Sequence, residues 1–261
     1  MTNSQDVAAT TSTSIHAHHG EAQPALVLVN LGTPTAPEPG PVRAFLREFL
    51  SDRRVIEMSP LLWKPILEGI ILRVRPREVA AKYRSIWMEE GSPLMHYTRE
   101  QARRLGERLP GVRVEVAMRY GQPSIGSVLD RLNAEGVRRV AILPAYPQYA
   151  ASTVATINDA VASWIGRNRD GFELRLHRSF PAAPAYIEAL ATALERHWEQ
   201  VGRPNFLTGD RVVVSFHSIP VAMDEAGDPY RAECRHTVAA LESRLGLAMG
   251  SLTATFQSVF G

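Results

Sequence analysis

Apolar and polar residues alternate in two different patterns along the chain. Short apolar or every-second-residue segments, typical of strands, lie at 25–31, 112–118, 137–143, 172–177, 211–217 and 252–257. Between them, apolar residues recur at three- and four-residue spacing, which predicts helices over 125–135, 153–165, 184–200 and 230–245. Repeated strand–helix–strand units favour an α/β protein whose parallel sheets carry helices on both faces.

The region after the first strand is predicted to be helical. Pro41 opens an amphipathic helix, and two further helical stretches follow near 61–73 and 77–87. Thr98 and Gln101 have the spacing of a capping box, which predicts a helix that begins there and ends near Leu109.

A weak internal repeat indicates two similar lobes. The strand ending in Gly32-Thr33-Pro34 resembles the one ending in His217-Ser218-Ile219-Pro220, although chance similarity of short apolar strands stays open. We therefore predict a first lobe over 24–180 and a second over 181–261. The first lobe continues with two more strands after its Arg119-Tyr120-Gly121 turn, whereas the sequence stops at the matching point of the second. On this pattern the second lobe is expected to be incomplete.

Composition narrows the class of protein. The 261 residues are 45% hydrophobic and 21% charged, as in ordinary globular proteins. Basic residues number 29 against 27 acidic ones, so a net charge of +2 predicts no nucleic-acid partner. Cys234 is the only cysteine, which excludes an internal disulfide and a cysteine-ligated iron–sulfur cluster. These features predict a cytoplasmic protein.

The first residues differ from the rest. Residues 1–23 are rich in Thr, Ser, Ala and His and contain no apolar run, which predicts a disordered tail rather than a signal peptide. No stretch reaches the roughly 18 apolar residues that a membrane span needs.

His217 is the first candidate for chemistry. It ends an apolar strand and precedes a Ser-Ile-Pro turn, at the edge where α/β sheets bind ligands. A neutral imidazole there can ligate a divalent metal or accept a proton near neutral pH. A hydrogen-bonded core histidine is the alternative interpretation.

Other strand ends carry residues suited to a flat, acidic ligand. Arg119 can hold a carboxylate and Tyr120 can stack on a ring, although a surface arginine beside a packed tyrosine is the alternative. Tyr146 and Tyr149 lie in a proline-containing loop that suggests a rigid aromatic wall. The helix start that follows this loop can bind an anion, or its hydroxyls can serve only as caps. The apolar stretch around Trp63 is either core or an exposed lip for a greasy ligand or a membrane.

Several motifs occur together in one order. They are Val29-Asn30-Leu31-Gly32-Thr33-Pro34, Phe49-Leu50-Ser51-Asp52, Tyr83-Arg84, Gly91-Ser92-Pro93-Leu94, Met118-Arg119-Tyr120-Gly121, Tyr146-Pro147-Gln148-Tyr149, Ser215-Phe216-His217-Ser218-Ile219-Pro220, Gly227-Asp228-Pro229-Tyr230 and Thr255-Phe256-Gln257-Ser258. From about Ala25 to Gly261 the sequence resembles the ferrochelatases, specifically the bacterial protohaem type without an iron–sulfur cluster.

The resemblance implies a fold and an activity. The fold is two Rossmann-like, chelatase-type lobes around a porphyrin cleft, and the reaction inserts ferrous iron into protoporphyrin IX during haem biosynthesis. Iron is then a substrate, and no cofactor is permanently bound. The resemblance assigns metal binding or proton removal to His217, and its porphyrin-contacting positions are Leu31, Ser92, Arg119, Tyr120, Tyr146 and Tyr149. It also implies a cleft lip near Trp63 that touches the inner face of the membrane.

The resemblance has a boundary. Family members continue past the Phe-Gln-Ser motif with the rest of the second lobe, a helix that packs on the first, and an acidic residue facing the histidine. We therefore expect the 261-residue polypeptide alone to be unstable or inactive. Alternatives are a non-catalytic porphyrin-binding fragment and a chelatase for another metal or for coproporphyrin.

Overall fold

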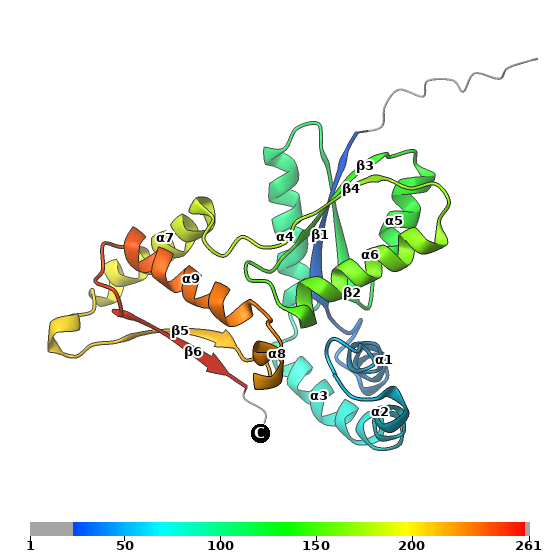
Figure 1. Ribbon diagram of the computed structural model, residues 1–261, viewed down its shortest axis with the longest axis horizontal. Helices are drawn as coiled ribbons and strands as arrows, with labels where there is room; N and C mark the ends of the chain where they lie inside the picture. The colour runs from blue at the N-terminus through cyan, green and yellow to red at the C-terminus, as the bar shows by residue number, and fades with distance from the viewer. Residues whose placement is uncertain (1–22, 259–261) are drawn as a thin grey trace, which may run out of the picture.

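The computed structural model describes residues 23–258 and contains two parallel β-sheets flanked by helices (Figure 1). The larger sheet has the order β2-β1-β3-β4, formed by β1 (Ala25–Gly32), β2 (Arg113–Tyr120), β3 (Arg139–Pro144) and β4 (Glu173–Leu176). The smaller sheet pairs β5 (Val212–His217) with β6 (Leu252–Gln257). All strand pairs are parallel, which confirms the predicted α/β class with two parallel sheets.

The helical segments connect these strands in the predicted alternation. They are α1 (Pro39–Leu50), α2 (Pro60–Ile66), the π-helical turn η1 (Leu67–Ile71), α3 (Leu72–Ile86), α4 (Pro93–Arg108), α5 (Ile125–Ala134), η2 (Ala151–Ala155), α6 (Thr156–Arg167), α7 (Pro184–Val201), η3 (Phe206–Thr208), α8 (Val221–Glu225) and α9 (Tyr230–Arg244). Only the short α8 and η3 were not anticipated, because neither is long enough to show a periodic apolar face.

Helices cover both faces of the larger sheet (Figure 1). On one face, the fully buried Val27 and Val29 belong to a core that α5 and α6 complete with Leu129 and Trp164. On the other face lies α4, where the Thr98 hydroxyl accepts a hydrogen bond of 3.0 Å from Asn30 Nδ2. Helices therefore pack on both faces of the sheet, and the strand ends lie beyond this cover.

The smaller sheet is covered differently. Val212, Val214 and Phe216 pack against the core formed by α7, α9 and Leu252. The residues between them point the other way, and Val213 is 58% exposed. Because side chains alternate across a strand, His217 falls on this second face, which no helix of the described residues covers.

The two strand pairs matched by the internal repeat have the same arrangement. β1 lies parallel to β2 with Gly32 opposite Tyr120, and β5 lies parallel to β6 with His217 opposite Gln257. At Gly32 the chains approach so closely that a Cβ would lie 1.8 Å from the Tyr120 carbonyl oxygen. With φ at 114°, this position requires glycine.

One helix prediction is wrong in its start. Thr98 does not cap a helix, because α4 begins at Pro93 and Ser92 is its N-cap, with the Ser92 hydroxyl accepting from Met95 N at 3.2 Å. Thr98 lies inside the helix and donates to the Leu94 carbonyl at 2.6 Å. The serine–proline pair, a cap followed by proline in the first turn, was the stronger start signal.

The two helices predicted at 61–73 and 77–87 are in fact one run of helical turns from Pro60 to Ile86. Pro76 does not end it. A proline removes one helical hydrogen bond, and here it lies on a buried face with Leu72 and Ala80, whose packing offsets that loss.

The predicted division into lobes at residue 180 stays a prediction. The larger sheet ends at Leu176 and α7 of the smaller unit begins at Pro184, so the division would fall in the connecting segment. The predicted tail at 1–23 lies outside the described residues, apart from Gln23.

Candidate active site at the carboxyl ends of the strands

Arg119 and Tyr120 end strand β2 and share one partner, Asp52. The Asp52 Oδ2 atom accepts hydrogen bonds from Arg119 Nη2 at 2.5 Å and from the Tyr120 hydroxyl at 2.9 Å. The Arg119 guanidinium also lies over the Tyr120 ring, 4.4 Å from its centroid. Arg119 was predicted to hold a ligand carboxylate, and in this structure the carboxylate that it holds is the protein's own.

Asp52 was not predicted to have a role. It follows α1, as the last residue of the Phe49-Leu50-Ser51-Asp52 motif. Its Oδ1 atom accepts a hydrogen bond of 2.8 Å from the Arg54 backbone N–H, which fixes the turn. Burial raises the pKa of Tyr120 well above its usual range, so the phenol stays neutral and donates to the carboxylate. The three side chains form a rigid polar group at the strand end.

Buried polar atoms without partners gather at the same edge. Within residues 23–258, four buried side-chain atoms have no hydrogen-bond partner: Thr33 Oγ1, Arg119 Nε, Tyr146 Oη and, on α6, Asn158 Oδ1. Thr33, Arg119 and Tyr146 lie at or just after the ends of β1, β2 and β3. Buried polar groups are normally satisfied, so orphaned atoms at one sheet edge mark a functional region.

Tyr146 and Tyr149 belong to the loop between β3 and η2, as the sequence indicates. Tyr146 packs against the core of the larger sheet, and burial raises its pKa far above the usual value. Tyr149 is half-buried, and the Arg178 guanidinium lies 4.6 Å from its ring centroid. The Tyr146 ring is held by packing and the Tyr149 ring by the arginine over it, and the rigid aromatic wall stays a prediction.

The helix start after this loop is already occupied by an acidic side chain. Asp228 Oδ2 accepts a hydrogen bond of 2.7 Å from the Ala151 backbone N–H, and its Oδ1 accepts from Tyr230 N at 3.0 Å. The anion that binds at this helix start is therefore a carboxylate of the chain itself, that of Asp228. The hydroxyls near this helix start do not cap it, since no side chain caps η2 in the manner of an N-cap residue.

His217 lies exposed at the end of β5. Its Nδ1 is 2.8 Å from the Ser218 carbonyl oxygen, which can only accept a hydrogen bond. Nδ1 therefore carries the proton, and the lone pair of Nε2 is available to a metal or a proton. Ser218 in turn donates to the Gln257 carbonyl at 2.8 Å through its backbone N–H, which ties this turn to β6.

Ser92 and Leu31 occupy supporting positions. Ser92 is only 3% exposed, and its hydroxyl accepts from the first turn of α4. Leu31 is half-buried, next to Asn30, whose Oδ1 accepts from the Leu31 backbone N–H at 2.8 Å. Their predicted contact with a porphyrin stays a prediction.

The predicted residues thus form separate groups. Arg119 and Tyr120 meet through Asp52, and Tyr149 is joined to Arg178, whereas no hydrogen bond, ion pair or ring contact among the described residues links His217 to the larger sheet. In Figure 1 the arrowheads of β5 and β6 point toward the middle of the molecule, near α8. Among residues 23–258, no three His, Cys, Asp or Glu side chains gather to hold a metal.

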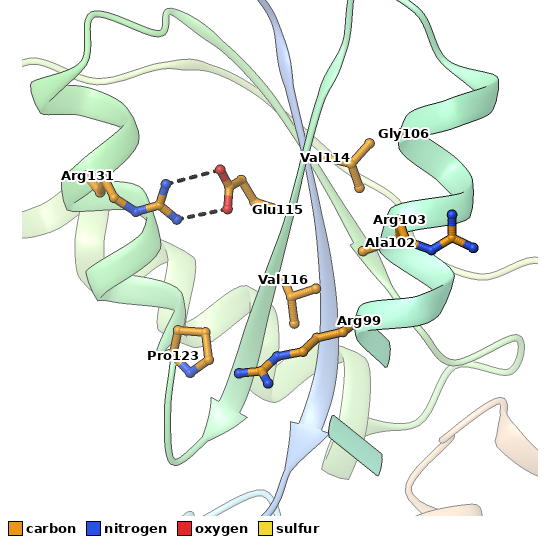
Figure 2. Close-up of a pocket in the computed structure, with 9 residues that line it drawn as sticks. All are labelled: Arg99, Ala102, Arg103, Gly106, Val114, Glu115, Val116, Pro123 and Arg131. Carbon is orange, nitrogen blue, oxygen red and sulfur yellow. Dashed lines mark hydrogen bonds and ion pairs between the residues drawn. The ribbon is translucent and has the colours of Figure 1, made fainter. Parts of the chain in front are cut away.

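A hollow elsewhere on the protein does not contain these residues. Figure 2 shows it beside the edge strand β2, between α4 and α5, with a volume of about 410 Å³. Val114 and Val116 line it, and Arg131 reaches across to Glu115 in a bidentate ion pair. It lies along the side of the strand rather than at its carboxyl end, so we do not place the active site there.

The apolar stretch around Trp63 divides into two faces. Leu67 and Leu72 are buried, and Trp63 Nε1 donates to the Leu50 carbonyl at 2.7 Å. The other face is a solvent-exposed set that we call the apolar lip: Leu61, Leu62, Ile66, Ile70 and Val74. Leu61 is 86% exposed. Within the described part of the chain, no helix is both long and apolar enough to cross a membrane.

Comparison with known proteins shows to which family the chain belongs. The family model described as Ferrochelatase matches residues 23–261. The ferrochelatase of Methylibium petroleiphilum is 48% identical over 250 residues, which cover 94% of this chain and 68% of the relative. Ferrochelatase 1 of Shewanella oneidensis is 46% identical over 241 residues, covering 90% of this chain and 71% of that protein. The match extends over nearly the whole chain and includes every site residue discussed above, so the chain belongs to the ferrochelatase family.

Proposed function

We propose that this protein inserts ferrous iron into protoporphyrin IX to form protohaem. The observation that carries the proposal is the His217 imidazole at an open strand end, with Nδ1 bound to the Ser218 carbonyl and Nε2 available. Membership in the ferrochelatase family supports the substrate class. Iron is a substrate here, and a cysteine-ligated cluster is not part of the proposal, because the sequence contains only the buried Cys234.

The chemistry sets the roles of the residues. Each ferrous ion that enters the ring displaces two pyrrole protons and must lose its bound water. We assign to His217 Nε2 the acceptance of a ring proton or the transient binding of the ion. Tyr146 and Tyr149 form stiff walls beside the ring, and Arg119 and Tyr120, fixed by Asp52, form the polar end of the larger sheet. Preorganised walls favour a distorted ring in which the nitrogen lone pairs meet the metal.

An anaerobic metallation assay tests the function. The chain, extended to the length of the relatives that it matches, is mixed with protoporphyrin IX and ferrous iron, and the spectrum is followed as free porphyrin becomes haem. We expect haem to form faster than without protein. Tight porphyrin binding without metallation would instead favour the non-catalytic alternative, and faster reaction with coproporphyrin or cobalt would change the substrate assignment.

We also propose that the protein is cytoplasmic and that the apolar lip rests on the membrane surface. Exposed apolar side chains on one helical face, with Lys64, Arg73 and Arg75 exposed nearby, suit an anionic bilayer. Such a contact would give a poorly soluble porphyrin a short path into the protein.

Vesicle binding tests the apolar lip. Replacing Leu61 and Leu62 with serine is expected to lower binding to phosphatidylglycerol-containing vesicles by at least about tenfold, since about 1.5–3 kcal/mol is associated with burying each leucine. Leu207→Ser is the control, because Leu207 is even more exposed, at 98%, but lies far along the chain in η3. Equal vesicle binding by all variants would exclude the lip as a membrane contact.

A further inference from the structure

The loop that carries Tyr149 is held by side chains from α9 and the turn before it. Gln148 Nε2 donates to Thr237 Oγ1 at 2.8 Å, and the Tyr149 backbone N–H donates to Glu233 Oε2 at 2.8 Å. Asp228 Oδ2 accepts from the backbone N–H of Ala151. Three contacts therefore join the aromatic loop of the larger sheet to α9, which covers the smaller sheet, and to the turn before it.

Glu233 differs from Thr237 and Asp228 because its carboxylate is linked to both the backbone and the ring of Tyr149. Its Oε2 binds the Tyr149 N–H, and its Oε1 accepts from Arg178 Nη1 at 2.6 Å. That same arginine lies over the Tyr149 ring, 4.6 Å from the centroid. One carboxylate thus fixes the main chain of Tyr149 and, through Arg178, the face of its ring.

The surroundings make this contact stiff. The Glu233 side chain is only 12% exposed, and the Ser179 hydroxyl adds a third donor at 3.3 Å. Hydrogen bonds to a charged group that is shielded from water are about twice as strong as neutral ones. Arg178 is more exposed, so its position over the ring depends on the carboxylate rather than on burial.

We propose that Glu233 is a positioning residue for porphyrin binding, which acts by clamping Tyr149 and so transmits the placement of α9 to the aromatic wall. The inference rests on the proposed function, since it takes Tyr149 to contact the porphyrin. It goes further because the position of Tyr149 then depends on Glu233, a residue of α9 that lies 84 positions away in the sequence. A purely structural role predicts that Glu233 and Tyr149 act independently on binding, and a positioning role predicts that they do not.

A double-mutant cycle separates these two roles. Protoporphyrin affinity of the 261-residue chain is measured by fluorescence for Glu233→Gln, Tyr149→Ala and the double variant, and amide hydrogen exchange is followed at Tyr149. We expect Glu233→Gln to weaken binding about tenfold and to speed exchange of the Tyr149 amide about tenfold. The double variant is expected to bind no worse than Tyr149→Ala, because the clamp has nothing left to position.

The control is Asp224→Asn, which removes a carboxylate in α8 that pairs with Arg231 at 2.8 Å and does not touch the loop. It should leave porphyrin affinity and Tyr149 exchange unchanged. Additive losses in the double variant, or unchanged exchange at Tyr149 in Glu233→Gln, would overturn the inference alone. Wild-type affinity in Tyr149→Ala would overturn the inference together with the proposed role of Tyr149.

Discussion

Replacing His217 with alanine is expected to slow iron insertion by about 100- to 10,000-fold, the range in which a positioned proton-transfer group contributes. The structure leaves Nε2 as the lone pair available at the end of β5, because Nδ1 is bound to the Ser218 carbonyl. Alanine removes that lone pair while the strand hydrogen bonds of β5 are unaffected. The rate of haem formation under saturating porphyrin and iron measures the change, in a chain extended to the length of the relatives that it matches.

A matched histidine shows whether the loss is specific. His197 is also exposed, but it lies on α7 within the helix, away from the strand ends. His197→Ala should keep the wild-type rate. If His217→Ala forms haem as fast as the unaltered chain, His217 has no part in metal or proton handling.

The second large effect is expected on stability, from Asp52→Asn. The side chains of Asp52 and Arg119 are only 8% and 18% exposed, so neutralising the carboxylate leaves a mostly buried guanidinium without its counter-charge. Asparagine can still accept from the Tyr120 hydroxyl, so the loss comes mainly from the ion pair. We expect the free energy of unfolding to fall by about 2–3 kcal/mol in urea denaturation.

An exposed ion pair provides the control for Asp52. Glu68 binds Arg47 at 2.7 Å, but the two side chains are 43% and 48% exposed, and pairs in water contribute little. Glu68→Gln should give no measurable change in unfolding. A change of less than about 0.5 kcal/mol in Asp52→Asn would mean that Arg119 finds another partner or solvent.

The fold was predictable to the extent that it depends on local patterns. Every strand lies within two residues of an expected apolar segment at each end, because buried parallel strands are almost continuously apolar. The predicted helix start at Thr98 was wrong because the residue spacing of a capping box also occurs inside helices. There the threonine hydroxyl donates to a carbonyl of the preceding turn. Pro76 misled because burial beside Leu72 and Ala80 outweighed its low helix propensity.

The site was predictable in its strand ends but not in its partners. The positions of His217, Arg119 and Tyr146 could be predicted, because a residue at or just after the end of a strand lies at the sheet edge. Asp52 and Asp228 could not, since they meet their partners across 67 and 77 positions of sequence. No local pattern encodes such contacts, and the carboxylates resemble ordinary turn residues until the fold brings them together.

A structure of the chain with free-base protoporphyrin IX bound tests the central claim most directly. We expect the ring to lie against the carboxyl ends of β1, β2 and β3, beside Tyr146 and Tyr149, with His217 Nε2 facing the ring centre. A porphyrin seated instead in the hollow beside β2, or one with His217 turned away from its centre, would contradict the account.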